Sequence, residues 1–245
     1  GKIKVLWIAC TNPAHSMPDQ ALVRAALEKV DFVVVQESFV GNETLQYADL
    51  ILPATTWPEK NGTVTNSERR ISRVRAALPA PGQARADWAI AAAVGRRLAR
   101  RLAPACEQQF AFSNEAAIFA EHAATTAGRD LDYSRLTYAQ LEVAPQQWPF
   151  DGQQGQVRLY THGDFPTTSG KAQFVSITWR APHDDVNAEF PLRLVTGRLR
   201  DHWHTTSRTA LVPTLTRHVE EPCLSLHSTD LAAYGLSPGA IGAGA

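Results

Sequence analysis

Three short apolar runs, separated by helix-like segments, constrain the fold of this chain more than any other feature of its sequence. The runs span residues 3–9, 31–37 and 48–52 and are rich in β-branched and aromatic side chains, which is typical of strands buried on both faces. Between them lie an amphipathic stretch at residues 18–29 and a short helical segment at residues 43–47. This βαβαβ order predicts right-handed crossovers and a parallel sheet, and hence an α/β fold.

The charge balance and the cysteines exclude several classes of partner and site. The 245 residues carry 24 basic and 24 acidic side chains, so no net field attracts nucleic acid or an anionic membrane. No apolar run reaches the roughly 20 residues that span a bilayer. Cys10, Cys106 and Cys223 lie far apart and form no CxxC pair, which favours a reducing compartment and indicates no zinc or iron–sulfur ligand set here. We therefore expect a cytoplasmic protein that binds neither nucleic acid nor membrane.

The rest of the chain carries weaker secondary-structure patterns. Residues 69–76 are predicted to be extended, and residues 87–102 and 114–127 are predicted to be helical. Alternating or apolar stretches predict strands at three further places, which are residues 156–160, 172–179 and 191–195.

Domain boundaries follow from the breakers between these patterns. The pattern weakens from Pro104, and a polar linker at residues 181–187 precedes a new apolar run. We therefore expect three parts, which are residues 1–103, 104–188 and 189–245. The chain begins without Met and ends in a run of small residues at 236–245, so we expect it to be a fragment of a longer protein.

A dense polar stretch, residues 57–70, directly follows the third apolar run. Gly62 stands among two Asn and two Thr residues, and their amides, hydroxyls and backbone N–H groups suit a ligand. Lys60 and the adjacent Arg69 and Arg70 add positive charge. Core packing requires none of these groups, and loops of such specific composition are usually functional.

Polar residues also follow the first two apolar runs. In an open parallel sheet, ligands bind beyond the carboxyl ends of the strands, and Asn12 and the pair Gln36 and Glu37 stand there. Glu37 can accept hydrogen bonds from ribose hydroxyls or from a base edge. Asp87 begins a predicted helix, so it either caps that helix or faces a ligand. Turn stabilisation is the alternative for Asn12, and the first turn lacks the GxGxxG fingerprint of nicotinamide binding.

A second polar cluster, residues 196–208, follows the apolar run at 191–195. It combines Gly197, which lets backbone amides approach a ligand, with a short arc of hydroxyl and imidazole donors. His202 and His204 would share one face of a strand and so resemble part of a zinc site, but no third ligand is evident. A solvated loop is another alternative, and a hydrolase triad lacks nucleophile-elbow spacing. The composition favours binding of an anion or a heterocycle.

Four segments together resemble a known family. Their sequences are LWIACTNP, VVVQE, ADLILP running into EKNGTVTNSERR, and VTGR continuing to HWHT. The chain resembles the molybdopterin oxidoreductases of the dimethyl sulfoxide reductase superfamily, and most closely the catalytic subunits of bacterial assimilatory nitrate reductases. The resemblance implies an α/β, Rossmann-like parallel-sheet domain over residues 1–103, which binds molybdopterin guanine dinucleotide. It also implies a connecting region over 104–188 and the start of a β-barrel domain of the double-psi type over 189–245.

The resemblance implies a cofactor, molybdenum bis(molybdopterin guanine dinucleotide), and a share of its site. Asp87 would accept hydrogen bonds from the guanine ring, and Lys60 would meet a phosphate or a polar ring atom. The positions that match the family's cofactor-binding segments are Asn12, Gln36, Glu37, Lys60, Asp87, Thr196, Gly197, Arg198, His202, Trp203, His204, Thr205 and Thr206.

Other polar residues receive supporting roles under the same resemblance. Asn66, Glu68, Arg69 and Arg70 are expected to brace the polar stretch through salt bridges and hydrogen bonds, and Cys10 is expected to pack at the end of its strand. No catalytic residue and no metal ligand is assigned. The molybdenum ligand and an N-terminal iron–sulfur cluster would lie upstream of this chain.

For the full-length protein, the resemblance implies reduction of nitrate to nitrite by oxygen-atom transfer at molybdenum. Electrons would arrive through the iron–sulfur cluster from an electron-donor protein or a reductase subunit, and the fragment alone would be inactive. Two alternatives remain open, namely a formate dehydrogenase catalytic subunit and a non-catalytic scaffold subunit that kept the fold. An upstream Cys at the molybdenum position together with a cluster motif would favour an enzyme over a scaffold.

Overall fold

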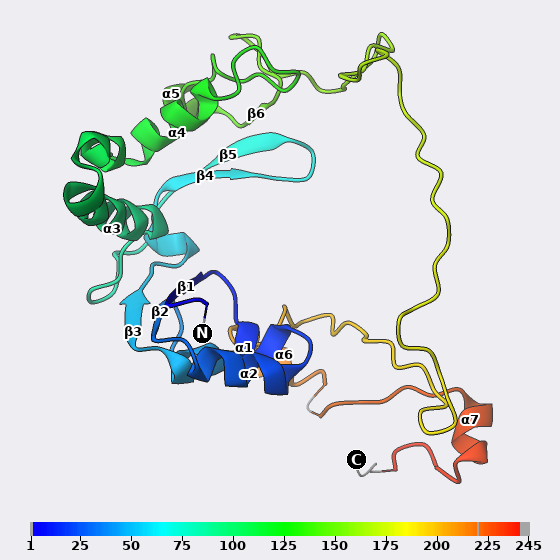
Figure 1. Ribbon diagram of the computed structural model, residues 1–245. Coiled ribbons are helices and arrows are strands. Elements are labelled where there is room, and N and C mark those ends of the chain that lie inside the picture. The colour runs from blue at the N-terminus through cyan, green and yellow to red at the C-terminus, as the bar shows by residue number, and fades with distance from the viewer. Residues whose placement is uncertain (1, 220, 241–245) are drawn as a thin grey trace. The chain divides into compact units, whose positions relative to one another are not determined.

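The computed structural model describes residues 2–219 and 221–240. The chain divides into two compact units, Gly1–Asp185 and Val186–Ala245 (Figure 1). The extents of the three predicted domains stay a prediction, and the last of them, 189–245, includes positions 220 and 241–245, which lie outside the described residues.

The first unit begins with a three-stranded parallel sheet, as the three apolar runs predict. The strands lie in the order β1-β2-β3, and β2 pairs with both neighbours. The α/β class is thereby confirmed. The strands are β1 (Val5–Ala9), β2 (Phe32–Glu37) and β3 (Leu50–Pro53), and their connections hold α1 (Pro13–Ser16), α2 (Gln20–Glu28) and η1 (Glu43–Tyr47).

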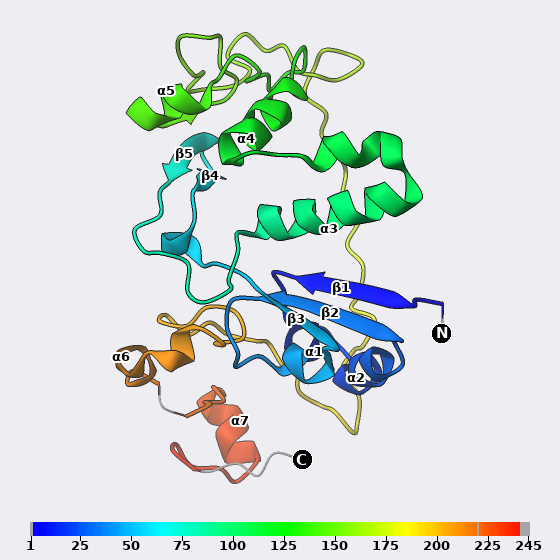
Figure 2. The same cartoon turned by 90° about the vertical axis from the view of Figure 1, so that its left-hand side faces the viewer.

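One face of this sheet forms a compact apolar core. Side chains alternate between the two faces of a strand, so Ile8 of β1 and Val33 and Val35 of β2 share a face. They pack against Ala14 and Leu27 of the connecting helices, and α1 and α2 lie against the same side of the sheet (Figures 1 and 2). The alternate residues Val5, Trp7, Phe32 and Leu50 are between 38% and 62% exposed, so the helix-covered face supplies most of the burial.

The polar stretch after β3 forms a β-hairpin, a feature that its composition did not predict. Strand β4 pairs with β5 in antiparallel register, and β5 also pairs with the short β6. The extended structure predicted at residues 69–76 is confirmed by β5. The bounds are η2 (Trp57–Glu59), β4 (Gly62–Thr65), β5 (Arg70–Val74) and β6 (Gln146–Gln147).

The hairpin tip is braced by its own polar side chains, as expected. Asn66 Oδ1 accepts from the backbone N–H groups of Glu68 at 3.1 Å and Arg70 at 3.0 Å. Glu68 Oε1 in turn accepts from Arg70 Nε at 3.3 Å. Arg69 donates to the carbonyl of Trp148 and, at 2.8 Å, to the carbonyl of Val157. These groups are therefore occupied in holding the hairpin.

Helices and a second apolar core follow the hairpin. The predicted helix at 87–102 is confirmed as α3, and the one at 114–127 as the shorter α4, whose first turn is capped by Asn114. The second core joins Ile71 of β5 to Phe119 and Leu141 of the helices. The bounds are α3 (Asp87–Leu102), η3 (Pro104–Phe110), α4 (Glu115–Ala124) and α5 (Tyr138–Val143).

Three predicted strands, at residues 156–160, 172–179 and 191–195, are wrong. The described residues form no strand beyond β6, and Phe174, Val175 and Ile177 are between 81% and 98% exposed. Alternation shows only which face a strand would present, whereas a strand exists only when a neighbour pairs with it. The second unit accordingly contains short helical elements, which are η4 (Thr209–Leu211), α6 (Pro213–Thr216) and α7 (Ser228–Ala233).

A pair of substitutions on α5 tests the second core. Leu141 is 1% exposed, whereas Val143 on the same helix is 89% exposed. Leu141→Ala should lower the free energy of unfolding by roughly 2–5 kcal/mol, because it removes buried methyl groups and leaves a cavity. Val143→Ala is the matched control and should change it by less than about 0.5 kcal/mol. Denaturant unfolding measures both, and equal effects would contradict the assigned core.

Candidate functional site

The carboxyl ends of the three parallel strands lie at one edge of the sheet, and predicted site residues gather there. Gln36 and Glu37 end β2, opposite Ala9 and Pro53 of the neighbouring strands. The segment before α3 returns to this edge, where the Arg85 carbonyl accepts from the Thr55 N–H at 3.0 Å. That contact brings the start of α3 to the ends of the strands, which is why residues far apart in sequence meet here.

Asp87, Lys60 and Gln36 form one connected group at this edge. Lys60 Nζ donates to Asp87 Oδ2 at 2.6 Å, and Gln36 Nε2 donates to Asp87 Oδ1 at 2.7 Å. The Lys60 side chain is 26% exposed and the Asp87 side chain 37% exposed, so the ion pair is partly accessible. Asp87 does not cap α3, since the N-cap position belongs to Ala86. The Asp87 carboxylate thus contacts Lys60 and Gln36 and does not cap its own helix.

The environment of Asp87 keeps its carboxyl group ionised. Burial is the largest single influence and raises the pKa of Asp87, but hydrogen bonds from Lys60 and Gln36 and the charge of Lys60 outweigh it. The net result is a pKa below the ordinary value of an aspartate. Asp87 thus presents an anionic acceptor at the edge of the sheet at neutral pH.

Asn12 and Glu37 lie at the same edge, but both are bound within the protein. Asn12 is 9% exposed, and its amide is hydrogen-bonded to Glu43 and Thr44. Glu37 Oε1 accepts from the backbone N–H of Ser38 at 2.7 Å, and Glu37 Oε2 accepts from Asn42 Nδ2 at 2.7 Å. These contacts order the loops that leave β1 and β2. Sequence reasoning missed Glu43 and Thr44 as the partners of Asn12, because residues some 30 positions apart leave no local pattern.

The remaining predicted residues lie in the second unit. Residues 196–198, which are Thr196, Gly197 and Arg198, are exposed and outside regular structure. His202 Nδ1 lies 2.9 Å from Thr209 Oγ1, and the rings of Trp203 and His204 meet edge-on with centroids 4.2 Å apart. Thr205 Oγ1 donates to Ser207 Oγ at 3.5 Å, and Thr206 and His204 both adopt positive φ. Residues 202–209 therefore form a compact turn, and residues 196–198 lie outside it.

An ion cluster beside this turn was missed by the sequence reasoning. Asp201 Oδ2 lies 2.5 Å from His218 Nδ1 and 3.0 Å from Arg200 Nη2. The hydrogen bond from Arg200, and then that from His218, lowers the pKa of Asp201. These three residues line a pocket of about 290 Å³ together with His202. Among the described residues, no three His, Cys, Asp or Glu side chains are placed to hold a metal ion.

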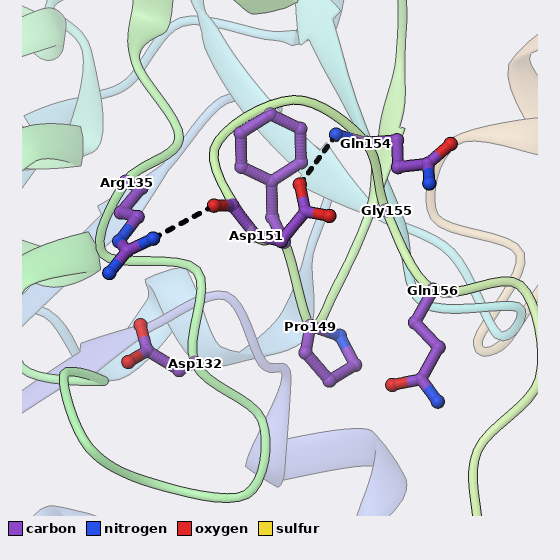
Figure 3. Close-up of a pocket in the computed structure, with 8 residues that line it drawn as sticks. Asp132, Arg135, Pro149, Asp151, Gln154, Gly155 and Gln156 are labelled. Atoms are coloured by element: carbon purple, nitrogen blue, oxygen red, sulfur yellow. Dashed lines mark hydrogen bonds between the residues drawn. The ribbon is translucent and has the colours of Figure 1, made fainter.

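A separate pocket of about 430 Å³ contains none of the predicted site residues (Figure 3). It lies between the turn that carries Asp132 and Arg135 and the loop that carries Asp151, Gln154 and Gln156. Asp151 Oδ1 accepts from the Gln154 N–H at 2.8 Å, and Arg135 Nη1 donates to the Asp151 carbonyl at 3.1 Å. The polar groups drawn in Figure 3 thus mainly shape the loop itself.

The ionisation of Asp87 gives a pH test with a defined sign. Because its pKa is lower in the folded protein, its contribution to stability is present above the ordinary aspartate pKa of about 3.9 and is lost as pH falls through the folded-state pKa. Asp87→Asn should remove this part of the acid dependence. Denaturant unfolding across the acid range measures it, and an Asp87→Asn curve parallel to that of the wild type would contradict the assignment.

None of the helices in the described part of the chain is long and apolar enough to cross a membrane.

Two family models match the chain. Residues 1–97 match "Molybdopterin oxidoreductase", and residues 192–241 match "Molydopterin dinucleotide binding domain". The first match contains the strand-edge residues, and the second contains the turn of the second unit. The predicted site residues thus fall within the two segments that the family models recognise.

Curated relatives agree with these matches. A nitrate reductase from Synechocystis sp. is 40% identical and covers 90% of this chain and 31% of its own length. A nitrate reductase from Shewanella frigidimarina is 39% identical, with 98% and 26% covered. The F420-dependent formate dehydrogenase subunit alpha of Methanocaldococcus jannaschii is 32% identical, with 97% and 34% covered. The chain therefore spans only about a third, or less, of these relatives' length. It belongs to the molybdopterin oxidoreductase family.

Proposed function

We propose that the sheet edge of the first unit binds the guanosine end of one arm of molybdenum bis(molybdopterin guanine dinucleotide). The observation that carries this proposal is the ionised, partly exposed Asp87 carboxylate, held between Lys60 and Gln36 at the carboxyl ends of parallel strands. This is the place where open parallel sheets bind nucleotides. Family membership supplies the ligand class, and the geometry supplies the residue that would recognise it.

The chemistry of Asp87 fits a guanine ring. Guanine presents a ring N–H and an exocyclic amino group side by side, and a carboxylate can accept from both. Adenine offers an unprotonated ring nitrogen at the corresponding edge, which an ionised carboxylate would repel. Lys60 keeps Asp87 charged, and its partly exposed ammonium group suits a phosphate or a polar ring atom. Gln36 fixes the orientation of the Asp87 carboxylate from a position that is 6% exposed. Glu37, the last residue of β2, is proposed to accept from the ribose.

We propose that the second unit contacts the pyranopterin and pyrophosphate part of an arm. Support comes from the match of residues 192–241 to a dinucleotide-binding family and from the donors gathered between Thr196 and Thr206. Backbone amides near Gly197, the Arg198 guanidinium and the imidazoles of His202 and His204 are the groups that suit phosphate and heterocycle atoms.

For the full-length protein we propose nitrate reduction to nitrite. When bound, the cofactor supplies the oxygen-atom transfer chemistry, and the residues of this chain hold and orient it. The nitrate reductases above share 40% and 39% identity with the chain, against 32% for the formate dehydrogenase. We further propose that an iron–sulfur cluster in the N-terminal part of the full-length protein delivers electrons from an electron-donor protein or a reductase subunit. The proposed location is the cytoplasm, and the proposed role is nitrate assimilation.

Formate oxidation is the second candidate, and a specific observation favours keeping it. The formate dehydrogenase relative covers 97% of this chain, so both classes share the segments present here. Assays of the full-length protein with nitrate and with formate separate the two. Activity with formate alone would overturn the nitrate proposal, and activity with neither, despite full cofactor loading, would favour a scaffold subunit.

Metal analysis of the purified full-length protein tests the cofactor proposal. We expect molybdenum in equimolar amount with the protein chain, together with guanine nucleotide, because the proposed cofactor contains both. Elemental analysis and chromatography of the released nucleotide measure them. A preparation with zinc alone, or without metal, from cells that supply molybdenum to other enzymes would overturn the proposal.

Two substitutions test the guanosine site. Lys60→Ala and Asp87→Ala should each weaken cofactor retention by about 1.5–3 kcal/mol, or roughly ten- to hundredfold in affinity, because each removes a charged hydrogen-bonding group. Molybdenum and nucleotide retained after gel filtration of the full-length protein measure the effect. Glu142→Ala, which removes a carboxylate that is 54% exposed and pairs with Arg73 and Arg75, is the control. Wild-type retention in both site variants would remove Lys60 and Asp87 from the site.

A further inference from the structure

The Asn12 side chain does not cap the helix at whose start it lies. Asn12 is the N-cap residue of α1, but its side chain makes no capping hydrogen bond. Asparagine in this position usually accepts from a backbone N–H of its own helix. Here the side chain is directed to η1, which follows it by about 30 residues. It therefore joins two strand-end loops, and the Ala14 N–H in the first turn of α1 donates to Thr44 Oγ1 instead.

Four residues, which we call the Asn12 network, make this connection: Asn12, His15, Glu43 and Thr44. Asn12 Nδ2 donates to Glu43 Oε2 at 2.7 Å, while Asn12 Oδ1 accepts from Thr44 Oγ1 at 2.6 Å and from Thr44 N at 3.3 Å. Glu43 Oε1 lies 3.0 Å from His15 Nδ1. Both ends of the Asn12 amide are thus engaged.

Burial makes the Asn12 network stiff on one side and accessible on the other. Thr44 is 0% exposed, and its Oγ1 also accepts from the Ala14 N–H at 3.1 Å. The side chains of Glu43 and His15 are 37% and 47% exposed. Buried polar groups that lose a partner are costly, so the turn between β1 and α1 is held in the arrangement that satisfies all of them. This turn leaves the same sheet edge at which Gln36 and Asp87 meet.

We propose that Glu43 and Thr44 are positioning residues of the nucleotide site. Through Asn12 they hold the turn at residues 10–13 in the conformation that the guanosine end of the cofactor requires. Asn12 then serves the site by fixing the turn, and its side chain is not a direct contact of the nucleotide. This inference rests on the proposed function of the sheet edge, and it extends the site to η1.

The charge of Glu43 supports this role. The hydrogen bond from Asn12 is the largest influence on the pKa of Glu43 and lowers it, and contacts with His15 lower it further against the opposing effect of burial. The acceptor for Asn12 is therefore an ionised carboxylate at neutral pH, and hydrogen bonds to such acceptors are stronger than those between neutral groups.

Substitutions of Glu43 in the full-length holoprotein separate positioning from general stability. Glu43→Ala removes the acceptor of Asn12, whereas Glu43→Gln keeps an oxygen that can accept the same hydrogen bond. Asp31→Ala is the matched control, because it removes an exposed carboxylate, paired with Lys4 at 2.8 Å, near the start of the neighbouring strand β2. The measurements are the rate of guanine nucleotide loss during dialysis and the midpoint of thermal unfolding.

We expect Glu43→Ala to lose nucleotide about tenfold faster than the wild type and Asp31→Ala to stay close to the wild type. Glu43→Gln should fall between them, because its neutral oxygen accepts a weaker hydrogen bond. Nucleotide retention unchanged in Glu43→Ala would overturn the inference. Equal nucleotide loss in Glu43→Ala and Asp31→Ala, matched by equal drops in the unfolding midpoint, would overturn it too, because that result indicates a purely structural effect.

A second pair of variants covers the case in which Glu43→Ala does not fold. Thr44→Ser keeps the hydroxyl that bridges Asn12 and Ala14, and Thr44→Val removes it at nearly constant volume. Faster nucleotide loss in Thr44→Val than in Thr44→Ser supports the inference, and equal rates overturn it. Wild-type protein that carries molybdenum but no guanine nucleotide at this edge would instead overturn the proposed function, so the two failures are distinguishable.

Discussion

The parallel pairing of β1, β2 and β3 is the constraint on which the rest of the site depends. Parallel strands place all their carboxyl ends at one edge, so residues that leave different strands meet without further adjustment. Val33, Val35 and Ile8 fix the register by filling the core on the helix-covered face. A shift of register by one residue would turn these side chains to the other face and would move Gln36 away from Asp87.

At this edge, electrostatics and burial oppose one another, and the balance gives Asp87 its chemistry. Burial alone would favour the neutral carboxylic acid, which would donate as well as accept. The hydrogen bonds from Lys60 and Gln36 reverse that preference and keep the group anionic. Such an acceptor suits a ring that presents two N–H donors. The Asn12 network acts on the other side of the edge, where it sets the path of the chain between β1 and α1.

Much of the first unit was predictable from the sequence because its signals are local. The apolar runs gave β1 to β3, and the Ala-rich stretch gave α3 with its observed bounds, Asp87–Leu102. The strands expected at residues 156–160, 172–179 and 191–195 failed because strand formation depends on a pairing partner that periodicity does not reveal. For the same reason, the polar stretch after β3 was read as a loop, although β4 pairs with β5 there.

The candidate site shows the same difference between residues with a local sequence signal and residues whose contacts are set by the tertiary fold. Lys60, Gln36 and Asp87 were assigned to the site from the resemblance to the family's cofactor-binding segments, and the fold brings the three together. Glu43 and Thr44 were missed, since their connection to Asn12 is set by the tertiary fold. Likewise, no spacing in the sequence indicates that His218 meets Asp201. The resemblance thus named Lys60, Gln36 and Asp87, and only the structure showed which groups they contact.

The central claim is that Asp87 at the sheet edge recognises the guanine end of the cofactor. An experimental structure of the full-length, cofactor-loaded protein tests it most directly, through the position of the guanine ring relative to the Asp87 carboxylate. The account predicts that the ring N–H and amino group of one guanine lie within hydrogen-bonding distance of Asp87, with Gln36 and Lys60 beside them. A guanine bound elsewhere, with Asp87 still paired only to Lys60 and Gln36, would contradict it.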